Sequence, residues 1–478
     1  MGRQRQRYAG GLALTAALTV LLFIGRPAAQ APGQGPGTPW EQPPQADEMA
    51  PQLLSGPDGQ VFRLVQRWTD FQTGGGGVIL ALASPQDTWR PVLELVSSEA
   101  GVTILGANVA FGPSKEVALA YQWRRHDPRT KEIRVARSVD GGKTWIQPST
   151  AVESSGAGFT PSLAWGREQS LVVVWADERS ATKTWTIFAR RSPDGGVTWE
   201  PEQELSRSPL MNSRDAFYSP VLAGDGRDRF WAVWLGLRNG RSSVYTSRST
   251  DGGRTWTDPV ALSGQSISVF RPRLLRSGDR LLVVWIDGRT QRDRIYAVNS
   301  ADGGVTWTSP TRVDHVPENS PKNAGTPIVV LGRDQEVFAT WQDGRNGRDD
   351  IFFGRSPDFG SSWGTEDIRL DMDEPGTAIS QSPRMARAED GRLAVAWEDD
   401  RAGYEGVYLR VGTPGRTPAW GPEVLVAPPG PKKAARISSL LWGPGGALYV
   451  AWEEWDHTMG PSNIRKRVNG RVLFPGKE

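Results

Sequence analysis

The sequence contains no cysteine, and only three of its 478 residues are histidine. Without cysteine the protein has neither a disulfide nor a thiol for lipid attachment, so packing alone must hold the fold together. The three histidines are isolated and lack the spacing of metal ligands, and no zinc motif, phosphate-binding loop or nucleophile elbow is present. We therefore expect the protein to bind neither a metal ion nor a cofactor.

Long apolar runs are also scarce, because the one such run covers residues 9–25. It follows a basic start and precedes a small-x-small sequence at residues 29–31, which is the pattern of an export signal. Residues 1–31 therefore predict a secreted, periplasmic or cell-surface protein. Pro32 follows the cleavage site directly and would impair cleavage, so the alternative is an uncleaved anchor that meets a membrane only through residues 9–25.

An excess of charge of one sign is lacking as well. The formal net charge is +3, and four arginines without any acid lie in residues 1–31, so the processed chain carries 3 − 4 = −1. A nearly neutral chain with interspersed charges argues against nucleic acid as the partner. Residues 32–48 are rich in proline, glycine and glutamine, which is typical of a linker. Residues 49–478 are then expected to form one folded domain.

The sequence is rich in one octapeptide. It reads SVDGGKTW, SPDGGVTW, STDGGRTW, SADGGVTW and SPDFGSSW, ending at Trp145, Trp199, Trp256, Trp307 and Trp363, and weaker copies end at Trp89 and Trp420. Successive copies are 51 to 57 residues apart. Repetition at a fixed period indicates that one small structural unit is copied and stacked to build the core.

Two further landmarks keep the same phase as the octapeptide. An apolar stretch ending in tryptophan, such as LLVVW285, precedes it in each unit, and a segment such as TPIV at Pro327 lies about fourteen residues before that. Each unit therefore reads as four short strands separated by turns. We predict an all-β fold, a single β-propeller of four-stranded antiparallel blades, with eight blades. Seven blades are the alternative, because the first and last units are irregular and could complete one blade jointly.

The octapeptide has a physical explanation as a turn. Its aspartate can accept hydrogen bonds from the backbone of the turn, its glycines supply positive φ angles, and its tryptophan can pack against a neighbouring blade. The pattern resembles the Asp-box, or bacterial neuraminidase repeat, of sialidase-like propellers over about residues 50–478. That resemblance implies that the turns lie on the face away from the active site. We expect a structural role, and no calcium binding, for Asp140, Asp194, Asp251, Asp302 and Asp358.

A second motif repeats in the loop after the tryptophan strand, on the face opposite the octapeptide turns. It contains an aspartate and an arginine two residues apart, at Asp177/Arg179, Asp287/Arg289, Asp343/Arg345 and Asp399/Arg401. In the fourth unit Gly236 replaces the acid and leaves Arg238. The two residues of each pair can bind each other and hold the loop. Alternatively, the ring of arginines could bind a carboxylate or sulfate.

Catalysis requires asymmetry, so positions that break the repeat are the better candidates. Most units carry a small residue before the proline of the first strand, but the fifth has Arg271, within Phe270-Arg271-Pro272. This resembles the Phe-Arg-Ile-Pro motif of sialidases, without its isoleucine. Tyr218 precedes Ser219 at the corresponding position of the fourth unit and resembles the sialidase nucleophile. Phe159 and Phe270 occupy the equivalent place, so packing alone also explains an aromatic residue there.

The resemblance implies a tyrosine nucleophile, a glutamate that activates it, an acid/base aspartate and three arginines. The catalytic candidates are Tyr218 as the nucleophile and Asp177 or Glu178 as the acid/base group. The candidates for the carboxylate clamp are Arg271 together with Arg289 or Arg345. Because most of that residue set is missing, we favour a module that binds a glycan or protein through the face opposite the Asp-box turns. An exo-sialidase-like glycoside hydrolase is the alternative, and a quinone dehydrogenase propeller is disfavoured because its repeat differs.

Overall fold

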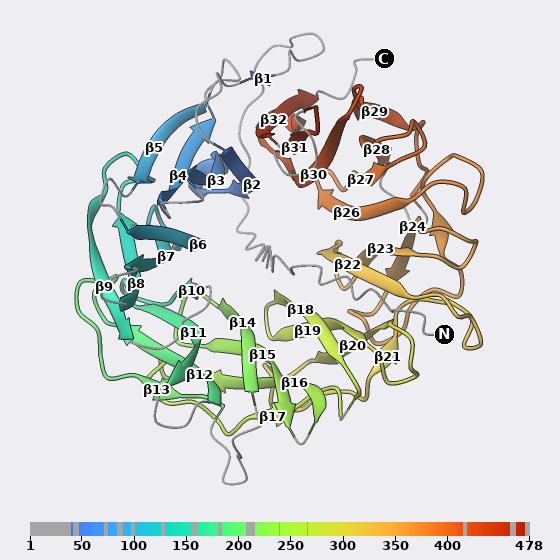
Figure 1. The fold of residues 1–478 in the computed structure, drawn as a ribbon. Coiled ribbons are helices and arrows are strands. Elements are labelled where there is room, and N and C mark those ends of the chain that lie inside the picture. Colours follow the sequence, from blue (N-terminus) through green and yellow to red (C-terminus); the bar gives the residue numbers. More distant parts are fainter. Residues whose placement is uncertain are drawn as a thin grey trace, which may run out of the picture.

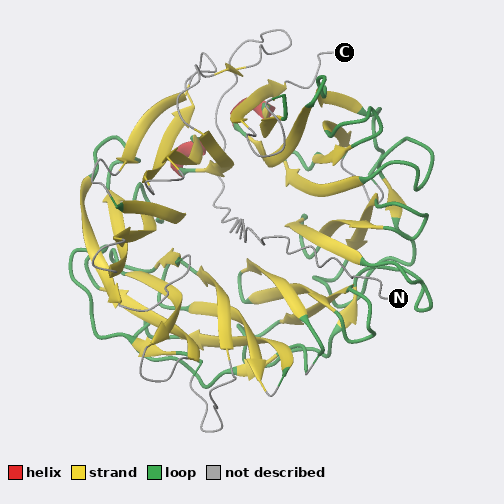
Figure 2. Ribbon diagram, viewed as in Figure 1, coloured by secondary structure: helices red, strands yellow, loops and turns green. Residues whose placement is uncertain are grey.

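The computed structural model describes residues 40–41, 47–70, 75–83, 89–96, 101–125, 130–154, 161–179, 184–206, 216–238, 240–264, 266–413, 418–458 and 465–473. Within these ranges the chain forms β-strands, and its helical structure is confined to two short 3-10 turns, η1 (Pro57–Gly59) and η2 (Pro444–Gly446) (Figure 2). No helix in these ranges is long and apolar enough to span a membrane. The predicted export signal lies outside the described residues.

Four-stranded units follow one another along the chain and are called blades 1 to 8 here. Blades 1 and 2 contain β2 (Asp47–Ser55), β3 (Val61–Asp70), β4 (Gly75–Ala83) and β5 (Trp89–Val96), then β6 (Val102–Phe111), β7 (Val117–Arg125), β8 (Thr130–Ser138) and β9 (Ile146–Ser154). Blades 3 and 4 contain β10 (Ser162–Trp165), β11 (Leu171–Arg179), β12 (Thr184–Ser192) and β13 (Gln203–Glu204), then β14 (Ala216–Gly224), β15 (Phe230–Arg238), β16 (Arg241–Ser249) and β17 (Val260–Ala261). A single parallel pair, Trp185 with Ala216, joins these two blades into one sheet.

The second half of the chain continues the pattern. Blades 5 and 6 contain β18 (Val269–Ser277), β19 (Arg280–Asp287), β20 (Arg294–Ser300) and β21 (Thr311–Arg312), then β22 (Ala324–Leu331), β23 (Val337–Asp343), β24 (Asp350–Ser356) and β25 (Ile368–Arg369). Blades 7 and 8 contain β26 (Ser380–Arg387), β27 (Leu393–Asp399), β28 (Gly406–Gly412) and β29 (Val424–Ala427), then β30 (Lys433–Trp442), β31 (Leu448–Asp456), β32 (Arg465–Leu473) and β1 (Trp40–Glu41).

The blades are arranged in a ring, with the first strand of each blade nearest the central axis (Figure 1). The first and last of the described strands meet in blade 8, where β1 pairs with β32. Within a blade the strands are antiparallel, and a hydrophobic cluster lies between each blade and the next, including one that joins blade 8 to blade 1. The predicted all-β propeller of four-stranded antiparallel blades is confirmed. The described sheets are consistent with eight blades, and the first and last units form separate sheets.

Two sets of tryptophans fill the spaces between blades. Those of the second strands in blades 3 to 7 are fully buried: Trp175, Trp234, Trp285, Trp341 and Trp397. Those of the octapeptides are partly buried and pack against the same clusters: Trp145, Trp199, Trp256, Trp307 and Trp363. Indoles bury large areas, so the repeated tryptophans account for much of the contact between blades.

The octapeptide turns share one set of hydrogen bonds. At Asp302, Oδ1 accepts from the Ser300 hydroxyl (2.8 Å) and the Thr306 amide (2.9 Å), and Oδ2 accepts from the Thr306 hydroxyl (2.6 Å). Gly303 and Gly304 have φ angles of 70° and 79°, which only glycine adopts freely. Matching bonds recur at Asp140, Asp194, Asp251 and Asp358.

Candidate functional site

The antiparallel order of the strands assigns the loops to two faces. The octapeptide turns and the turns between first and second strands share one face, as shown by the bond from the Gly303 amide to the Asp279 carbonyl (2.9 Å). The starts of the first strands and the loops between second and third strands lie on the opposite face, called the top face here. All candidate ligand-binding residues predicted from the sequence belong to strands or loops at this face.

The Asp-x-Arg motif of blade 5 forms a closed structural unit. Asp287 is fully buried, and its carboxylate accepts hydrogen bonds from the indole of Trp285 (2.9 Å), the hydroxyl of Ser266 (2.7 Å) and the guanidinium of Arg289 (2.6 Å). The Arg289 guanidinium lies 4.2 Å from the ring centre of Tyr296, and that ring stacks on Trp285. Hydrogen bonds from Arg289 and Trp285 keep the pKa of Asp287 below its usual value although burial opposes this.

Blades 6 and 7 repeat the unit. Arg345 binds Asp343 (2.6 Å) and Asp367 (2.6 Å), and its guanidinium lies 4.0 Å from the ring centre of Phe352. Arg401 binds Asp399 (2.5 Å) and also Glu423 (2.7 Å). The carboxylates around Arg289, Arg345 and Arg401 therefore already compensate their charges, which favours the structural interpretation of the Asp-x-Arg pairs.

Blade 4 lacks the unit for a steric reason. A Cβ atom at Gly236 would come within 2.5 Å of the ring of Tyr245 and 2.7 Å of the ring of Phe217. Phe217 is buried and makes an edge contact with Tyr245, so an aromatic ring fills the space that an aspartate takes in blade 5. Arg238 is half-buried at the end of β15.

No hydrogen bond or ion pair among the described residues joins Tyr218 to an acid or a base. Tyr218 packs against the clusters on both sides of blade 4, and no described residue forms a hydrogen bond with its hydroxyl. Burial alone raises its pKa, without a contribution from any charged neighbour. Asp177 is fully buried and Glu178 half-buried at the end of β11, and the side chain of Arg179 lies outside the described residues.

The first strands carry strained residues near their top ends. Ser219, Arg271, Thr326 and Ser382 each precede a proline and have φ angles of 54°, 54°, 54° and 55°. The strand pairing shifts at each of these positions, so a β-bulge accommodates the turn of the backbone. This conformation costs a residue other than glycine about 1–2 kcal/mol, and such strain is concentrated at functional sites.

Three arginines of the first strands, Arg271, Arg273 and Arg384, are called the inner arginines here. Arg273 and Arg384 both directly follow the strained residue's proline, and sequence reasoning missed them. Burial, then the charges of Arg384 and Arg271, lower the pKa of Arg273 to about 10. Burial also lowers the pKa of Arg384, and the charge of Arg271 adds to this effect. The electrostatic coupling indicates that side chains of blades 5 and 7 approach one another near the axis.

The charges of two inner arginines lack compensation by acids in contact. Arg384 donates to the backbone carbonyls of Ser438 (2.8 Å), Pro383 (3.0 Å) and Ser382 (3.2 Å). Arg271 is exposed, and its one described hydrogen bond, to the hydroxyl of Thr326, is 3.4 Å long. No carboxylate among the described residues lies within 4.0 Å of either guanidinium. This distinguishes them from the arginines of the Asp-x-Arg units.

Aromatic rings lie on the top face of blades 7 and 8. Tyr404, in the loop after β27, is exposed and stacks on His457, which follows β31, at 6.5 Å between ring centres. The ring centres of Trp455 and His457 are 6.5 Å apart, and the guanidinium of Arg436 lies 4.1 Å from the ring centre of Trp455. Aromatic rings beside a few polar groups are common in ligand-binding sites.

Comparison with known proteins identifies the repeat. Residues 167–395 match the family model described as the BNR repeat-like domain. The resemblance predicted from the octapeptides is therefore confirmed over these residues, which include the Asp-box aspartates Asp194, Asp251, Asp302 and Asp358. No curated protein matches the chain.

Solved structures with similar folds include three sialidases. A leech intramolecular trans-sialidase shares 11% identity over 91% of this chain and 93% of that one, with a TM-score of 0.40. The intramolecular trans-sialidase of Ruminococcus gnavus shares 14% identity over 78% of this chain and 94% of that one, with a TM-score of 0.41. The NanB sialidase of Streptococcus pneumoniae shares 12% identity over 87% of this chain and 84% of that one, with a TM-score of 0.40.

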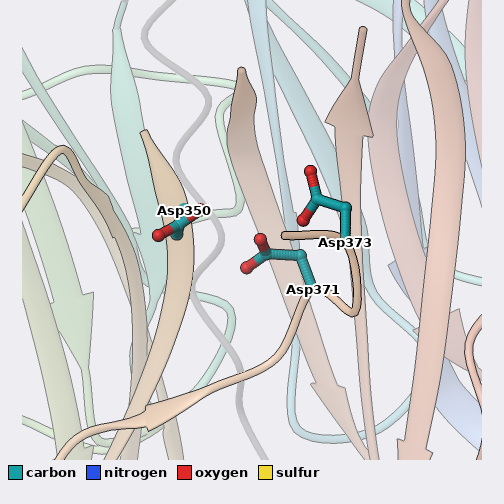
Figure 3. Close-up of side chains that lie close together, drawn as sticks. All are labelled: Asp350, Asp371 and Asp373. Carbon is teal, nitrogen blue, oxygen red and sulfur yellow. The ribbon is translucent and has the colours of Figure 1, made fainter. Parts of the chain in front are cut away.

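Residues 167–395 also contain a cluster of three carboxylates, Asp350, Asp371 and Asp373, shown in Figure 3. One oxygen of each lies within 4.8 Å of the others. The guanidinium of Arg369 contacts all three, at 3.2 Å, 2.5 Å and 2.5 Å. Burial and the nearby carboxylate of Asp350 hold the pKa of Asp371 well above its usual range. The arginine occupies the place that a cation would need, so the cluster is best explained as part of the scaffold.

Proposed function

We propose that the protein is an exported, non-catalytic binding module that holds a glycan through the top face of its propeller. The glycan carries a carboxylate or sulfate group, which binds the inner arginines Arg271, Arg273 and Arg384. The export signal predicted in residues 1–31 supports a location where the module meets external glycans. No nucleic acid is involved, and contact with a membrane is limited to residues 9–25 if the signal is retained.

The observation that carries this proposal is that no described carboxylate lies within 4.0 Å of the guanidinium of Arg271 or Arg384. Arg271 is exposed and Arg384 is held by backbone carbonyls, so neither guanidinium has an acid in contact that would offset its charge. A guanidinium binds carboxylate and sulfate groups through paired hydrogen bonds, so an acidic ligand would supply the missing partner.

The aromatic rings of Tyr404, His457 and Trp455 support a carbohydrate ligand. Sugar rings present apolar C–H faces as well as hydroxyl groups, and an exposed aromatic ring offers a matching flat surface. These residues share the top face with the inner arginines. A glycan that extends from the axis toward blades 7 and 8 would contact both groups.

The environment of Tyr218 favours binding over hydrolysis. A tyrosine nucleophile needs a base to remove its proton, whereas burial raises the pKa of Tyr218 and no described residue accepts its proton. Arg271 is the one predicted clamp residue among the inner arginines. The alternative function, an exo-sialidase-like hydrolase, would require the residues around Tyr218 to rearrange when substrate binds.

The test compares an acidic glycan with its neutral counterpart. Calorimetry should detect binding of 3′-sialyllactose and no binding of lactose. Arg271→Gln should weaken the affinity about tenfold or more, since charge-assisted hydrogen bonds contribute roughly 1.5–3 kcal/mol. Arg254→Gln is the matched control, because Arg254 is exposed on the Asp-box face. Equal affinity for both sugars would overturn the anion assignment.

A second measurement separates binding from hydrolysis. We expect no release of the fluorophore from a fluorogenic sialoside by the purified protein. Turnover that disappears in Tyr218→Phe would establish the hydrolase instead, because the substitution removes only the phenolic oxygen. A glycan array on which no acidic sugar binds would remove support for the proposed function altogether.

A further inference from the structure

A buried glutamate lies near Arg384 without a cationic partner in contact. Glu398, on β27, is 5% exposed and pairs in register with Gln381 of β26. Its one described hydrogen bond comes from the Gln381 amide at 3.3 Å. Buried carboxylates are normally satisfied by an ion pair or several hydrogen bonds, so Glu398 is unusually poorly stabilised in its charged form.

Charged groups of neighbouring segments act on Glu398, but none forms an ion pair with it. Arg384 of β26 and Arg436 of β30 supply positive charge, while Glu405, before β28, and Glu453 of β31 supply negative charge. Arg384 is held by backbone carbonyls, and Arg436 binds Glu405 at 3.1 Å. No described cation lies within 4.0 Å of the Glu398 carboxylate.

These surroundings place the titration of Glu398 near neutrality. Burial raises its pKa to about 7, although the charges of Arg436 and Arg384 act in the opposite direction. Glu405 and Glu453 add to the increase. Near neutral pH, a small change in the surroundings of Glu398 therefore changes the protonation of its carboxyl group.

We propose that Glu398 couples proton uptake to the binding of an anion at Arg384, so that the top face holds acidic glycans at low pH and releases them as the pH rises. This inference rests on the proposed anion site. An anion at Arg384 neutralises the charge that stabilises ionised Glu398 and adds negative charge nearby. Both effects favour the protonated carboxyl.

Linkage fixes the direction of the pH dependence. If anion binding favours protonated Glu398, protonation must favour anion binding by the same factor. Affinity is then highest below the pKa of the ligand-free protein and falls as the pH rises through and above it. A single coupled proton lowers the affinity by at most tenfold per pH unit. Between pH 6 and pH 8 we expect a decrease of about three- to tenfold.

The binding experiment uses 3′-sialyllactose, whose carboxylate stays ionised throughout, between pH 5.5 and pH 8.5. Wild-type protein should lose affinity as the pH rises, and calorimetry in buffers of different ionisation enthalpy should detect proton uptake. Glu398→Gln should bind with an affinity that is independent of pH in this range. Glu389→Gln, which alters an exposed glutamate of the same blade on the Asp-box face, should behave as wild type.

A ligand-free measurement keeps the two proposals separate. A carboxyl with a raised pKa destabilises the folded state as the pH rises through that pKa, so Glu398→Gln should gain stability relative to wild type between pH 5 and pH 8. Identical pH profiles of unfolding for both proteins would overturn the inference. Binding that depends on Arg271 but not on pH would also overturn it and leave the proposed function intact. Absence of binding at every pH would overturn both.

Discussion

The indole N–H of Trp285 donates a hydrogen bond of 2.9 Å to the carboxylate of Asp287, and both side chains are fully buried. The same carboxylate binds Arg289, whose guanidinium covers Tyr296, and Tyr296 stacks on Trp285. The carboxylate therefore accepts hydrogen bonds from both the indole and the guanidinium, while the rings fill the space between blades 4 and 5. The Asp-x-Arg motif thus connects a buried tryptophan to the top face.

Replacing Asp287 tests this relationship. Asp287→Ala should lower the free energy of unfolding by about 3–5 kcal/mol, because it leaves Arg289 without its buried partner and Trp285 without an acceptor. Urea denaturation measures the change. The double variant Asp287→Ala/Arg289→Ala should lose less free energy of unfolding than the two single variants lose together, since both substitutions remove the same interaction. Additive effects, or a loss below about 1 kcal/mol, would show that the unit contributes little.

Gly236 should not tolerate a side chain. Gly236→Ala places a methyl group about where the rings of Tyr245 and Phe217 already lie, at 2.5 Å and 2.7 Å. Overpacking of this kind costs about 1–3 kcal/mol. Gly325→Ala is the control, because no atom lies within 4 Å of a Cβ at that position. Thermal unfolding of the two variants should separate them, and equal melting temperatures would contradict the steric explanation of the missing aspartate.

The Asp-box turns should contribute stability that depends on acid. Hydrogen bonds from Thr144 and Ser138 lower the pKa of Asp140 to about 2. A lowered pKa stabilises the folded state above the unfolded value of about 3.9, and this contribution disappears as the pH falls through about 2. Wild type should therefore exceed Asp140→Asn in its urea midpoint at neutral pH, with a difference that shrinks below pH 4.

The control for the Asp-box variant is Asp258→Asn. Asp258 is exposed and forms no hydrogen bond or ion pair with any described residue. Its replacement should leave the urea midpoint unchanged across the pH range. A difference between wild type and Asp140→Asn that stays constant from pH 7 to pH 2 would show that the charge of Asp140 is not involved.

The fold could be predicted from the sequence because its decisive interactions are local. The hydrogen bonds that the Asp302 carboxylate accepts come from residues between Ser300 and Thr306, so the octapeptide carries them wherever it occurs. The pairing of Asp287 with Arg289 is equally local and was anticipated as one of two interpretations. Repetition then extended each local conclusion to the other blades.

The candidate site was harder to predict because its residues come from different blades. Arg273 of blade 5 and Arg384 of blade 7 meet only when the ring closes, and no spacing along the chain reports that distance. Their shared position after proline was a signal, since other units carry Ser162, Val221 and Ile328 there. Glu398 directly precedes the predicted Asp399/Arg401 pair, but its burial beside Arg384 depends on the packing of blade 8.

The Asp box at residues 356–363 departs from the repeat sequence at Phe359. Backbone strain and burial of the ring have opposite effects on stability there. Phe359 replaces the first glycine and adopts a φ angle of 59°, which costs a residue other than glycine about 1–2 kcal/mol. Its ring is 1% exposed and belongs to the cluster between blades 5 and 6. Removing a buried phenylalanine costs about 3–5 kcal/mol. The loss of burial should therefore exceed the relief of strain.

We expect Phe359→Gly to lower the free energy of unfolding by about 2–3 kcal/mol, although glycine restores the repeat sequence. Asp334→Gly provides the control, because Asp334 has a similar φ angle of 53° but is exposed. That substitution relieves the same strain without losing burial, so its stability should stay within about 1 kcal/mol of wild type. Urea denaturation distinguishes the two. An increase in stability for Phe359→Gly would mean that backbone strain, and not the packing of the ring, dominates at this turn.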